Sequence, residues 1–216
     1  RIGVYFTEAE ERKYLNDLNV SAGLPYDERF ENEPPQERTA FVDPFEVEPD
    51  WKTLDGLDFL LWHLKFNLHD GDATAFAYTM QLLAYSLQNR IKAGVLILFT
   101  GVQGTGKTAV FGCNESGPGV LMRIYGDCGM VYNNIDALLK DFNADSCGKL
   151  YCLLEEANPG NSTRNNNQLK DIITGGRQRI ERKGVDAFHV DCYRSFISCS
   201  QDVPFKIEQG DRRFVV

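Results

Sequence analysis

The sequence predicts an α/β fold in which a parallel sheet is flanked by helices and preceded by a small helical segment. Short apolar runs of strand length recur at Val95–Phe99, Leu150–Leu154 and Ser195–Cys199. Segments of helical character separate these runs, and a glycine-rich loop directly follows the first. Parallel strands need long crossover connections, so strands that alternate with helices favour a parallel α/β sheet.

The first 90 residues differ in character from the rest of the chain. Residues 1–50 are polar and broken by prolines, so we expect an extended lead-in or a linker there. Residues 51–68 and 73–89 carry apolar side chains at helical spacing, joined by the turn signal at 69–72. Residues 1–90 are thus predicted to form a lead-in followed by a collar-like helical hairpin, whose aromatic residues are interpreted as core packing.

Residues 91–216 are predicted to form a second domain. The chain stops within an apolar run at Val216, so we expect this domain to be truncated and the chain to be a fragment. Asn134 is a predicted N-cap of a short helix that runs through Phe142. The other expected elements are a strand at 120–124, a loop at 159–167, a helix at 168–174 and a hairpin with arms at 179–182 and 187–190.

Charge is distributed unevenly along the chain. The formal net charge is −8, with −9 over residues 1–90 and +1 over 91–216. Residues 164–183 hold six basic and two acidic side chains, a local patch that a polyanion could meet. No apolar run approaches the roughly 20 residues of a membrane span, so we expect a soluble, intracellular protein without a membrane partner. Six cysteines without a CxxC pair predict reduced thiols rather than a zinc site.

The glycine-rich loop at Gly101–Thr108 fits the P-loop pattern G-x-x-x-x-G-K-[ST]. Its glycines let successive backbone N–H groups point at one phosphate, and the following helix adds a partial positive charge. Lys107 can reach the β- and γ-phosphates, while the Thr108 hydroxyl can hold Mg²⁺. The motif predicts ATP and Mg²⁺ as ligands, with the ATP-binding residues Gly101, Gln103, Gly104, Thr105, Gly106, Lys107 and Thr108.

An acidic pair, Glu155 and Glu156, ends the second apolar run. In a P-loop enzyme one carboxylate assists Mg²⁺ and another orients or deprotonates the attacking water. We assign the metal role to Glu155 and the water role to Glu156. The alternative is that both are solvated glutamates at a strand end.

Two further places carry candidate residues for sensing or stabilising phosphate charge. Either Ser200 or Gln201, after the third strand, could sense the γ-phosphate, and the alternative is an ordinary loop. Arg212 and Arg213 could stabilise transition-state charge at a neighbouring subunit, and the alternative is a surface salt bridge.

The tip of the predicted hairpin is the best candidate for contact with nucleic acid. Arg182 and Lys183 precede Gly184, and a lysine beside a glycine on a protruding loop can approach a phosphate backbone closely. The alternative is a solvated charged turn.

Taken in order, these motifs resemble the superfamily 3 helicases, the AAA+ type replicative helicases of viruses, phages and mobile elements. The similarity runs from the P-loop through Glu155-Glu156, then 169–176 into Arg182-Lys183-Gly184, and on to 210–214. It is closest to the poxvirus-like and phage primase-helicase branch. The family's third motif usually ends in Asn, whereas this chain has Ser200-Gln201.

The resemblance implies an ATP-dependent DNA helicase motor of replication that forms a homohexamer around single-stranded DNA. Lys107 and Thr108 would be its Walker A pair and Glu155 and Glu156 its Walker B pair. Lys183 would contact DNA, and Arg212 or Arg213 would be the arginine finger. Any primase or origin-binding module would lie outside these residues. The expected location is a viral replication site in the host cytoplasm or nucleus, or the bacterial cytoplasm.

Two other functions fit the same motifs. One is an AAA+ type ATPase that does not unwind, such as a loader, a packaging motor or a remodelling switch. The other is a non-catalytic assembly platform that ATP only stabilises, although the acidic pair argues against it.

Overall fold

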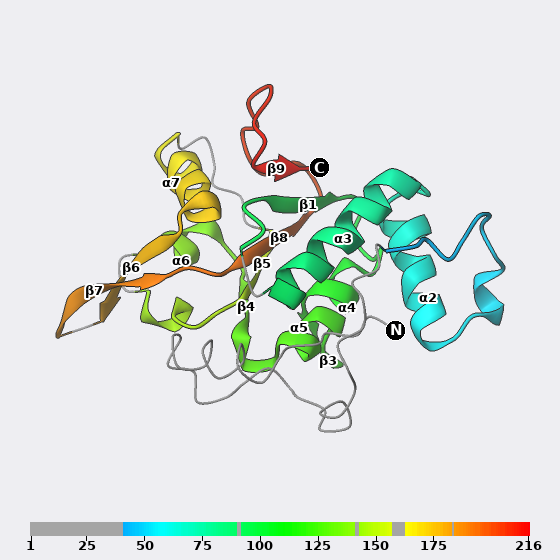
Figure 1. Ribbon diagram of the computed structural model, residues 1–216, viewed down its shortest axis with the longest axis horizontal. Coiled ribbons are helices and arrows are strands. Elements are labelled where there is room, and N and C mark those ends of the chain that lie inside the picture. The colour runs from blue at the N-terminus through cyan, green and yellow to red at the C-terminus, as the bar shows by residue number, and fades with distance from the viewer. Residues whose placement is uncertain (1–40, 90–91, 141–142, 157–162, 183) are drawn as a thin grey trace.

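A central sheet of five parallel strands organises the protein (Figure 1). The computed structural model describes residues 41–89, 92–140, 143–156, 163–182 and 184–216. The strand order is β4-β5-β8-β1-β9. The strands are β1 (Leu96–Thr100), β4 (Gly129–Tyr132), β5 (Tyr151–Glu155), β8 (Ser195–Ser200) and β9 (Phe214–Val215). The α/β class with a parallel sheet and flanking helices is therefore confirmed.

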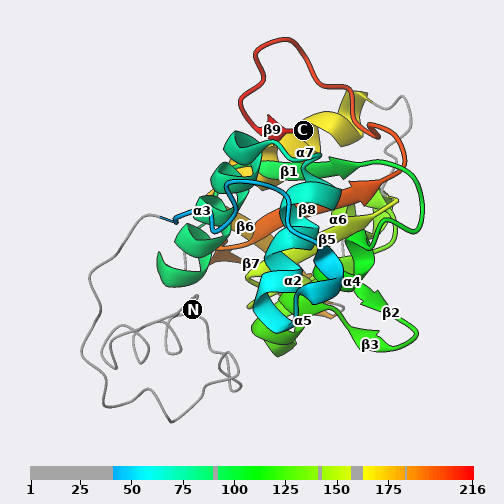
Figure 2. The same cartoon turned by 90° about the vertical axis from the view of Figure 1, so that its right-hand side faces the viewer.

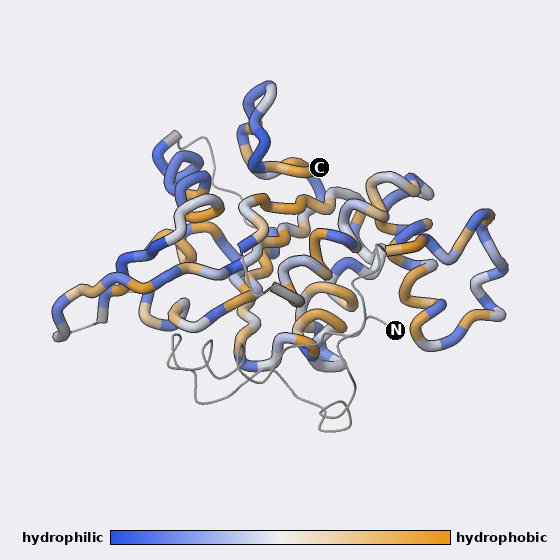
Figure 3. Tube along the Cα trace, viewed as in Figure 1, coloured by the Kyte–Doolittle hydropathy of each residue, from blue (hydrophilic) through white to orange (hydrophobic). Residues whose placement is uncertain are grey.

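Both faces of the sheet are covered, which is why the inner strands are buried along nearly their whole length, including the three serines of β8. In β1 the first four residues are buried, and in β8 all six are buried. Hydrophobic residues gather along these inner strands and on the helices that cover them (Figure 3). The predicted runs 95–99, 150–154 and 195–199 match β1, β5 and β8 to within one residue at each end.

One face of the sheet is covered by the N-terminal helices and the helices that follow the P-loop sequence (Figure 2). Buried Phe76 and Met80 pack in one core with Phe99, Phe111 and Tyr151. The elements on this face are η2 (Trp51–Thr53), α2 (Gly56–Trp62), η3 (His63–Leu68), α3 (Ala73–Asn89), α4 (Lys107–Phe111) and α5 (Val120–Tyr125). The helical hairpin thus lies against the sheet, while the division of the chain at residue 90 stays a prediction.

The opposite face is covered by α6 (Ile135–Leu139) and α7 (Thr163–Thr174). Their buried residues Leu138, Leu169 and Ile173 pack on Leu98 and Leu154 of the sheet. Short elements complete the described fold: η4 (Gly126–Cys128), η5 (Ala144–Ser146), and the strand pairs β2 (Cys113–Asn114) with β3 (Gly117–Pro118) and β6 (Arg177–Arg182) with β7 (Val185–Asp191).

Several polar contacts fix the segment 41–72 on the protein. The buried ammonium of Lys65 donates to Asp43 Oδ2 and to the Phe45 carbonyl, both at 2.6 Å. His69 Nδ1 lies 2.7 Å from the Leu64 carbonyl, and its Nε2 lies 2.9 Å from Thr79 Oγ1. Because a carbonyl only accepts, Nδ1 carries the proton and Nε2 accepts from the Thr79 hydroxyl. These contacts hold η3 against α3.

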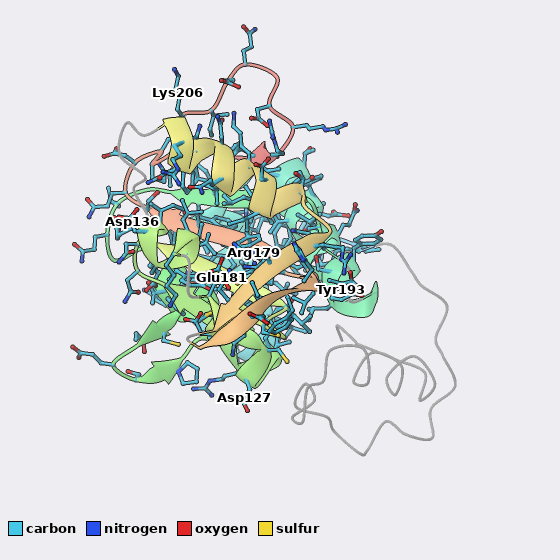
Figure 4. The ribbon with its side chains drawn as sticks, turned by 90° about the vertical axis from the view of Figure 1, so that its left-hand side faces the viewer. Asp127, Asp136, Arg179, Glu181, Tyr193 and Lys206 are labelled. Carbon is cyan, nitrogen blue, oxygen red and sulfur yellow. The ribbon has the colours of Figure 1, made fainter. Side chains whose placement is uncertain are left out.

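The β6–β7 hairpin projects from the body on the side opposite α2 (Figure 1). Its strand β6 is held by Asn143, whose side-chain amide donates to the Arg179 carbonyl and accepts from the Glu181 N–H, both at 3.0 Å. Arg179 and Glu181 on β6 lie in the middle of the face seen in Figure 4. The predicted hairpin is confirmed.

The structure corrects several predicted elements. The predicted strand at 120–124 is helix α5, because Leu121 and Tyr125 are buried four residues apart while Ile124 between them is exposed. The run 51–68 is divided into η2, α2 and η3, the last being a π-helical turn.

Two predicted boundaries also change. Helix α7 begins at Thr163, within the predicted loop 159–167, and Asn166 there is buried and donates to the Lys206 carbonyl at 2.8 Å. Asn134 caps α6 as predicted, by accepting from the Ala137 N–H. That helix ends at Leu139, and residues 141–142 lie outside the described residues.

Candidate functional site

The sequence motifs converge at the carboxyl edge of the sheet, as they must when the strands that carry them are parallel. The loop 101–106 follows β1, Glu155 ends β5, and Ser200 ends β8. Thr100 is opposite Ser200 in the register, and Glu155 is opposite Cys199. The Gly101 N–H donates to the Ser200 carbonyl at 3.2 Å, and the Glu156 N–H donates to the Cys199 carbonyl at 3.0 Å. Ligands of open α/β sheets bind at this edge.

The loop has the backbone that its glycines predict. Gly101, Gly104 and Gly106 have positive φ values of 148°, 87° and 82°. Side chains other than glycine rarely adopt these values, so the curvature of the loop depends on glycine. Helix α4, which follows, is only five residues long. The amides of the loop, rather than the dipole of a long helix, therefore offer the donors for a phosphate.

The side chain of Lys107 folds back onto the 101–108 loop. Its ammonium donates to the carbonyls of Gly101 and Val102 at 2.8 and 3.0 Å and to Thr105 Oγ1 at 3.1 Å. Among the residues that the structure describes, no carboxylate forms an ion pair with it. The positive charge at the loop is thus held by neutral acceptors alone.

Thr108 and Glu155 meet beside Gly112. A Cβ placed on Gly112 would lie 2.6 Å from Glu155 Oε1 and 3.0 Å from Thr108 Cγ2, so both side chains border the same point. Glu155 Oε1 is buried and has no hydrogen-bond partner among the described residues. A buried carboxylate oxygen without a partner is costly, and a cation is the partner that suits it.

Glu156 lies next to this point with an unusual backbone. Its φ is +49°, a left-handed value that is uncommon for a residue other than glycine and that often marks a functional site. Its side chain is exposed. Below it, burial raises the pKa of the Cys199 thiol to about 12, so this thiol is neutral beside Lys107, Glu155 and Glu156.

The two candidate sensors lie in different surroundings. Ser200 is buried at the end of β8, and its hydroxyl donates to the Asp202 carbonyl. Gln201 is exposed in the bend that follows. Of the two residues, Ser200 is held beside the loop, because its carbonyl accepts the hydrogen bond from the Gly101 N–H. The sensor role of either residue stays a prediction.

The two arginines also differ. Arg213 donates from Nε to Asp211 Oδ1 at 2.8 Å and from Nη2 to Asp211 Oδ2 at 3.2 Å. Lys170 Nζ lies 2.9 Å from the same carboxylate, which is almost fully buried. Arg213 is therefore held within its own chain, whereas Arg212 is exposed. A role in trans for either arginine stays a prediction, and the geometry leaves Arg212 as the freer side chain.

The predicted DNA contact falls largely outside the described residues. Lys183 lies outside them, and of Arg182 only the backbone is described, paired with Val185 in the hairpin. The described arginines of β6 are paired: Arg177 with Asp191 at 3.6 Å, and Arg179 with Glu181.

Sequence reasoning missed one residue of the site, His63. A Cβ placed on Gly106 would lie 2.7 Å from both Cε1 and Nε2 of its ring, so the imidazole lies directly on the P-loop sequence. Burial lowers the pKa of His63, and a hydrogen bond to the Gly106 backbone partly offsets this. Nothing in the spacing of the motifs places a histidine 43 positions upstream against this loop, and only the folded helices bring it there.

The donor set suits a magnesium ion that arrives with a phosphate ligand. Among the described residues, no group of three or more His, Cys, Asp or Glu side chains could hold a metal by itself. Mg²⁺ typically keeps waters and takes one or two protein oxygens plus substrate phosphates. The unpartnered Glu155 oxygen, with the Thr108 side chain beside it, fits that pattern. Within the described part of the chain, no helix has the length and apolar character to cross a membrane.

Comparison with known proteins gives a family and a set of relatives. The profile of a family of unknown function (DUF5906) matches residues 99–213. The DNA primase-polymerase of Nitratiruptor phage NrS-1 is 31% identical over 159 residues. Those residues are 71% of this chain and 21% of the relative, so the chain spans about a fifth of the length of the curated relative that it matches.

Solved structures of that phage protein share the fold. An apo structure of the C-terminal region of NrS-1 superposes with a TM-score of 0.62 at 27% identity, covering 80% of this chain and 39% of the other. A second apo structure of this region gives a TM-score of 0.59 at 26% identity and covers 80% and 38%. The chain is thus homologous to a phage replication protein, and that coarser part of the resemblance is confirmed.

These relatives correct the activity expected from the sequence. The expected function was an ATP-dependent helicase motor, but the relative is a DNA primase-polymerase, which is an enzyme of replication with a different activity. The motif order shared with helicases was taken to imply their activity. Function resides in sites rather than in the fold, so a shared order of motifs is not sufficient for that inference.

Proposed function

The chain belongs to the DUF5906 family of unknown function, and we propose that its 101–108 loop binds ATP and Mg²⁺ within a DNA replication protein. The observation that carries this proposal is the convergence at the sheet edge. Lys107 lies there without a counter-charge among the described residues, beside Thr108 and an unpartnered oxygen of Glu155. A P-loop NTPase identity, predicted from the motif, is part of the same proposal.

Each residue has a defined task in this proposal. The N–H groups of the glycine loop surround the phosphates, and Lys107 exchanges its carbonyl contacts for phosphate oxygens, which are stronger acceptors for an ammonium. Thr108 and Glu155 would hold the Mg²⁺, which when bound neutralises phosphate charge. Glu156 stands next to them as the candidate that positions water, should the bound nucleotide be hydrolysed.

Calorimetric titration of the protein with ATP in the presence of Mg²⁺ tests this proposal. Lys107→Ala should weaken ATP by roughly 100-fold, and Glu155→Gln should weaken the part of the affinity that depends on Mg²⁺. Lys206→Ala is the matched control, because Lys206 is an exposed lysine on a loop away from the sheet edge (Figure 4). The proposal is wrong if wild-type protein shows no saturable binding at millimolar ATP, or if Lys107→Ala binds as the wild type does.

DNA is the proposed macromolecular partner, because the curated relative is a DNA primase-polymerase. The hairpin tip with Arg182 and Lys183 remains the proposed contact, and phosphate contacts of this kind depend on salt. Substitution of both by Ala should weaken binding of a labelled single-stranded oligonucleotide and lower the salt slope. Unchanged affinity and an unchanged salt slope would show that DNA contacts another part of the protein. The predicted homohexamer is also retained as a proposal, to be tested by sedimentation with and without ATP.

A further inference from the structure

Four rings form a continuous row beside the 101–108 loop. Trp51 stacks on Trp62 with ring centroids 5.9 Å apart, and Trp62 stacks on Phe59 at 5.8 Å. Phe59 then stacks on His63, one helical turn later, at 6.3 Å and an interplanar angle of 22°. The row, defined as Trp51, Phe59, Trp62 and His63, starts at the loop and leads away from it across α2, which lies next to α4 (Figure 2).

His63 fixes the end of the row on the loop. Asn67 Nδ2 lies 3.0 Å from His63 Nδ1, and an amide nitrogen only donates, so Nδ1 accepts. The proton of the neutral ring is then on Nε2, which is left to make the hydrogen bond to the Gly106 backbone. The imidazole is therefore bound to the last glycine before Lys107.

The row is both anchored and accessible. Trp62 is 7% exposed and holds the others in place, whereas Phe59 is 39% and Trp51 47% exposed. Asp50 caps the turn that carries Trp51 by accepting from the Lys52 N–H at 3.1 Å. Phe59 also contacts the Trp51 ring at 6.5 Å, and the rest of its own ring is open to solvent beside the loop-bound His63.

We propose that the base of the nucleotide stacks on Phe59, while His63 fixes this group of rings on the loop. This inference rests on the proposed binding of ATP at the loop and adds the part of the site that recognises the nucleoside. Stacking tolerates every base, since each has a π face, so the site takes nucleoside triphosphates as a class, with purines favoured by their larger rings.

Charge on α2 favours a nucleotide base over a DNA strand as the occupant. Asp55 and Asp58 lie at the start of the helix that carries Phe59, and both are exposed. Carboxylates repel the phosphates of a polynucleotide, whose binding depends on neutralisation by basic residues. Among the described residues, Lys52 is a basic residue at the row and lies over the Trp51 ring at 5.8 Å. A base whose phosphates are bound at the loop avoids that repulsion.

A comparison of two ligands isolates the base. Affinities of the full chain for MgATP and for magnesium tripolyphosphate, which has the phosphates without the nucleoside, are measured by calorimetry. Phe59→Ala should weaken ATP by about tenfold, the typical worth of a stacked base. It should leave tripolyphosphate within about twofold, so this ligand also reports that the variant is folded.

Tyr78→Ala is the matched control, because Tyr78 is 43% exposed on α3 and stacks on no ring of the row among the described ring contacts. Equal losses for both ligands in Phe59→Ala, or no loss, would overturn the proposal. So would a loss of oligonucleotide binding by Phe59→Ala with unchanged ATP affinity, which would assign the row to single-stranded DNA. Failure of the wild type to bind either ligand would instead reject the nucleotide site itself.

Discussion

Two lysines near opposite ends of the fold are held in opposite ways. Lys107 has three neutral acceptors, two carbonyls and a hydroxyl. Lys170 is buried between two carboxylates, Glu208 at 3.0 Å and Asp211 at 2.9 Å. Arg213 shares the same Asp211. One cation is left uncompensated at a sheet edge, and the other is neutralised within the fold.

The difference distinguishes a candidate binding site from a structural ion-pair cluster. This cluster, called the staple, consists of Lys170, Glu208, Asp211 and Arg213. A buried charge is tolerated when it is paired, and the Lys170 cluster joins α7 to the segment before β9 in that way. A charge that the protein leaves without a counter-ion can accept an anion without first breaking an ion pair. Lys107 should therefore matter for binding and little for stability, and Lys170 should show the reverse.

The largest expected effect is on the staple. Asp211→Ala would leave Lys170 buried with Glu208 alone and would release Arg213. Breaking a buried ion pair in this way typically costs about 3 kcal/mol of unfolding free energy, which denaturant titration can measure. Asp127→Ala, at an exposed aspartate far from this cluster (Figure 4), is the control. A loss no greater than that of the control would remove the distinction between the two lysines.

Substitution of Lys107 tests the candidate binding site. Lys107→Ala should weaken ATP by roughly 100-fold, about 3 kcal/mol, because a charge-assisted contact to phosphate is lost. Its unfolding free energy should stay close to that of the wild type, since only hydrogen bonds to its own loop are removed. A variant that binds poorly and is also strongly destabilised would show that Lys107 has a structural role like that of Lys170.

Acid should lower the stability contributed by the two histidines, His63 and His69, and by the staple around Asp211 in different pH ranges. Burial lowers the pKa of His63 and His69 from the ordinary 6.5, so the unfolded chain binds more protons than the folded one just below that value. Stability should thus fall as pH drops below about 6.5, and His69→Gln should flatten that slope. The Arg213 and Lys170 contacts hold the pKa of Asp211 well below 3.8, so the staple weakens only at far lower pH. A flat profile from pH 7 to 5 would contradict the histidine assignment.

The sequence predicted the sheet better than the site. The run at 195–199 and the glycine pattern of 101–108 are local signals, and they predicted β8 and the loop correctly. The short run at 120–124 fits a strand and a buried helix equally well, and only tertiary burial decides between them. His63 reaches Gly106 through the packing of a π-helical turn on the loop, which no local pattern encodes.

The smallest expected effect on stability is that of Arg212, compared with the adjacent Arg213. Arg213 is bound to the buried Asp211, whereas Arg212 is exposed. Arg212→Ala should therefore change the unfolding free energy by less than about 0.5 kcal/mol, and Arg213→Ala should lower the melting temperature by clearly more. If Arg212 acts at a neighbouring subunit, its loss should also change the ATP-dependent sedimentation of the protein, while the melting temperature stays constant. Equal thermal losses for the two variants would show that the Arg212 side chain belongs to the staple as well.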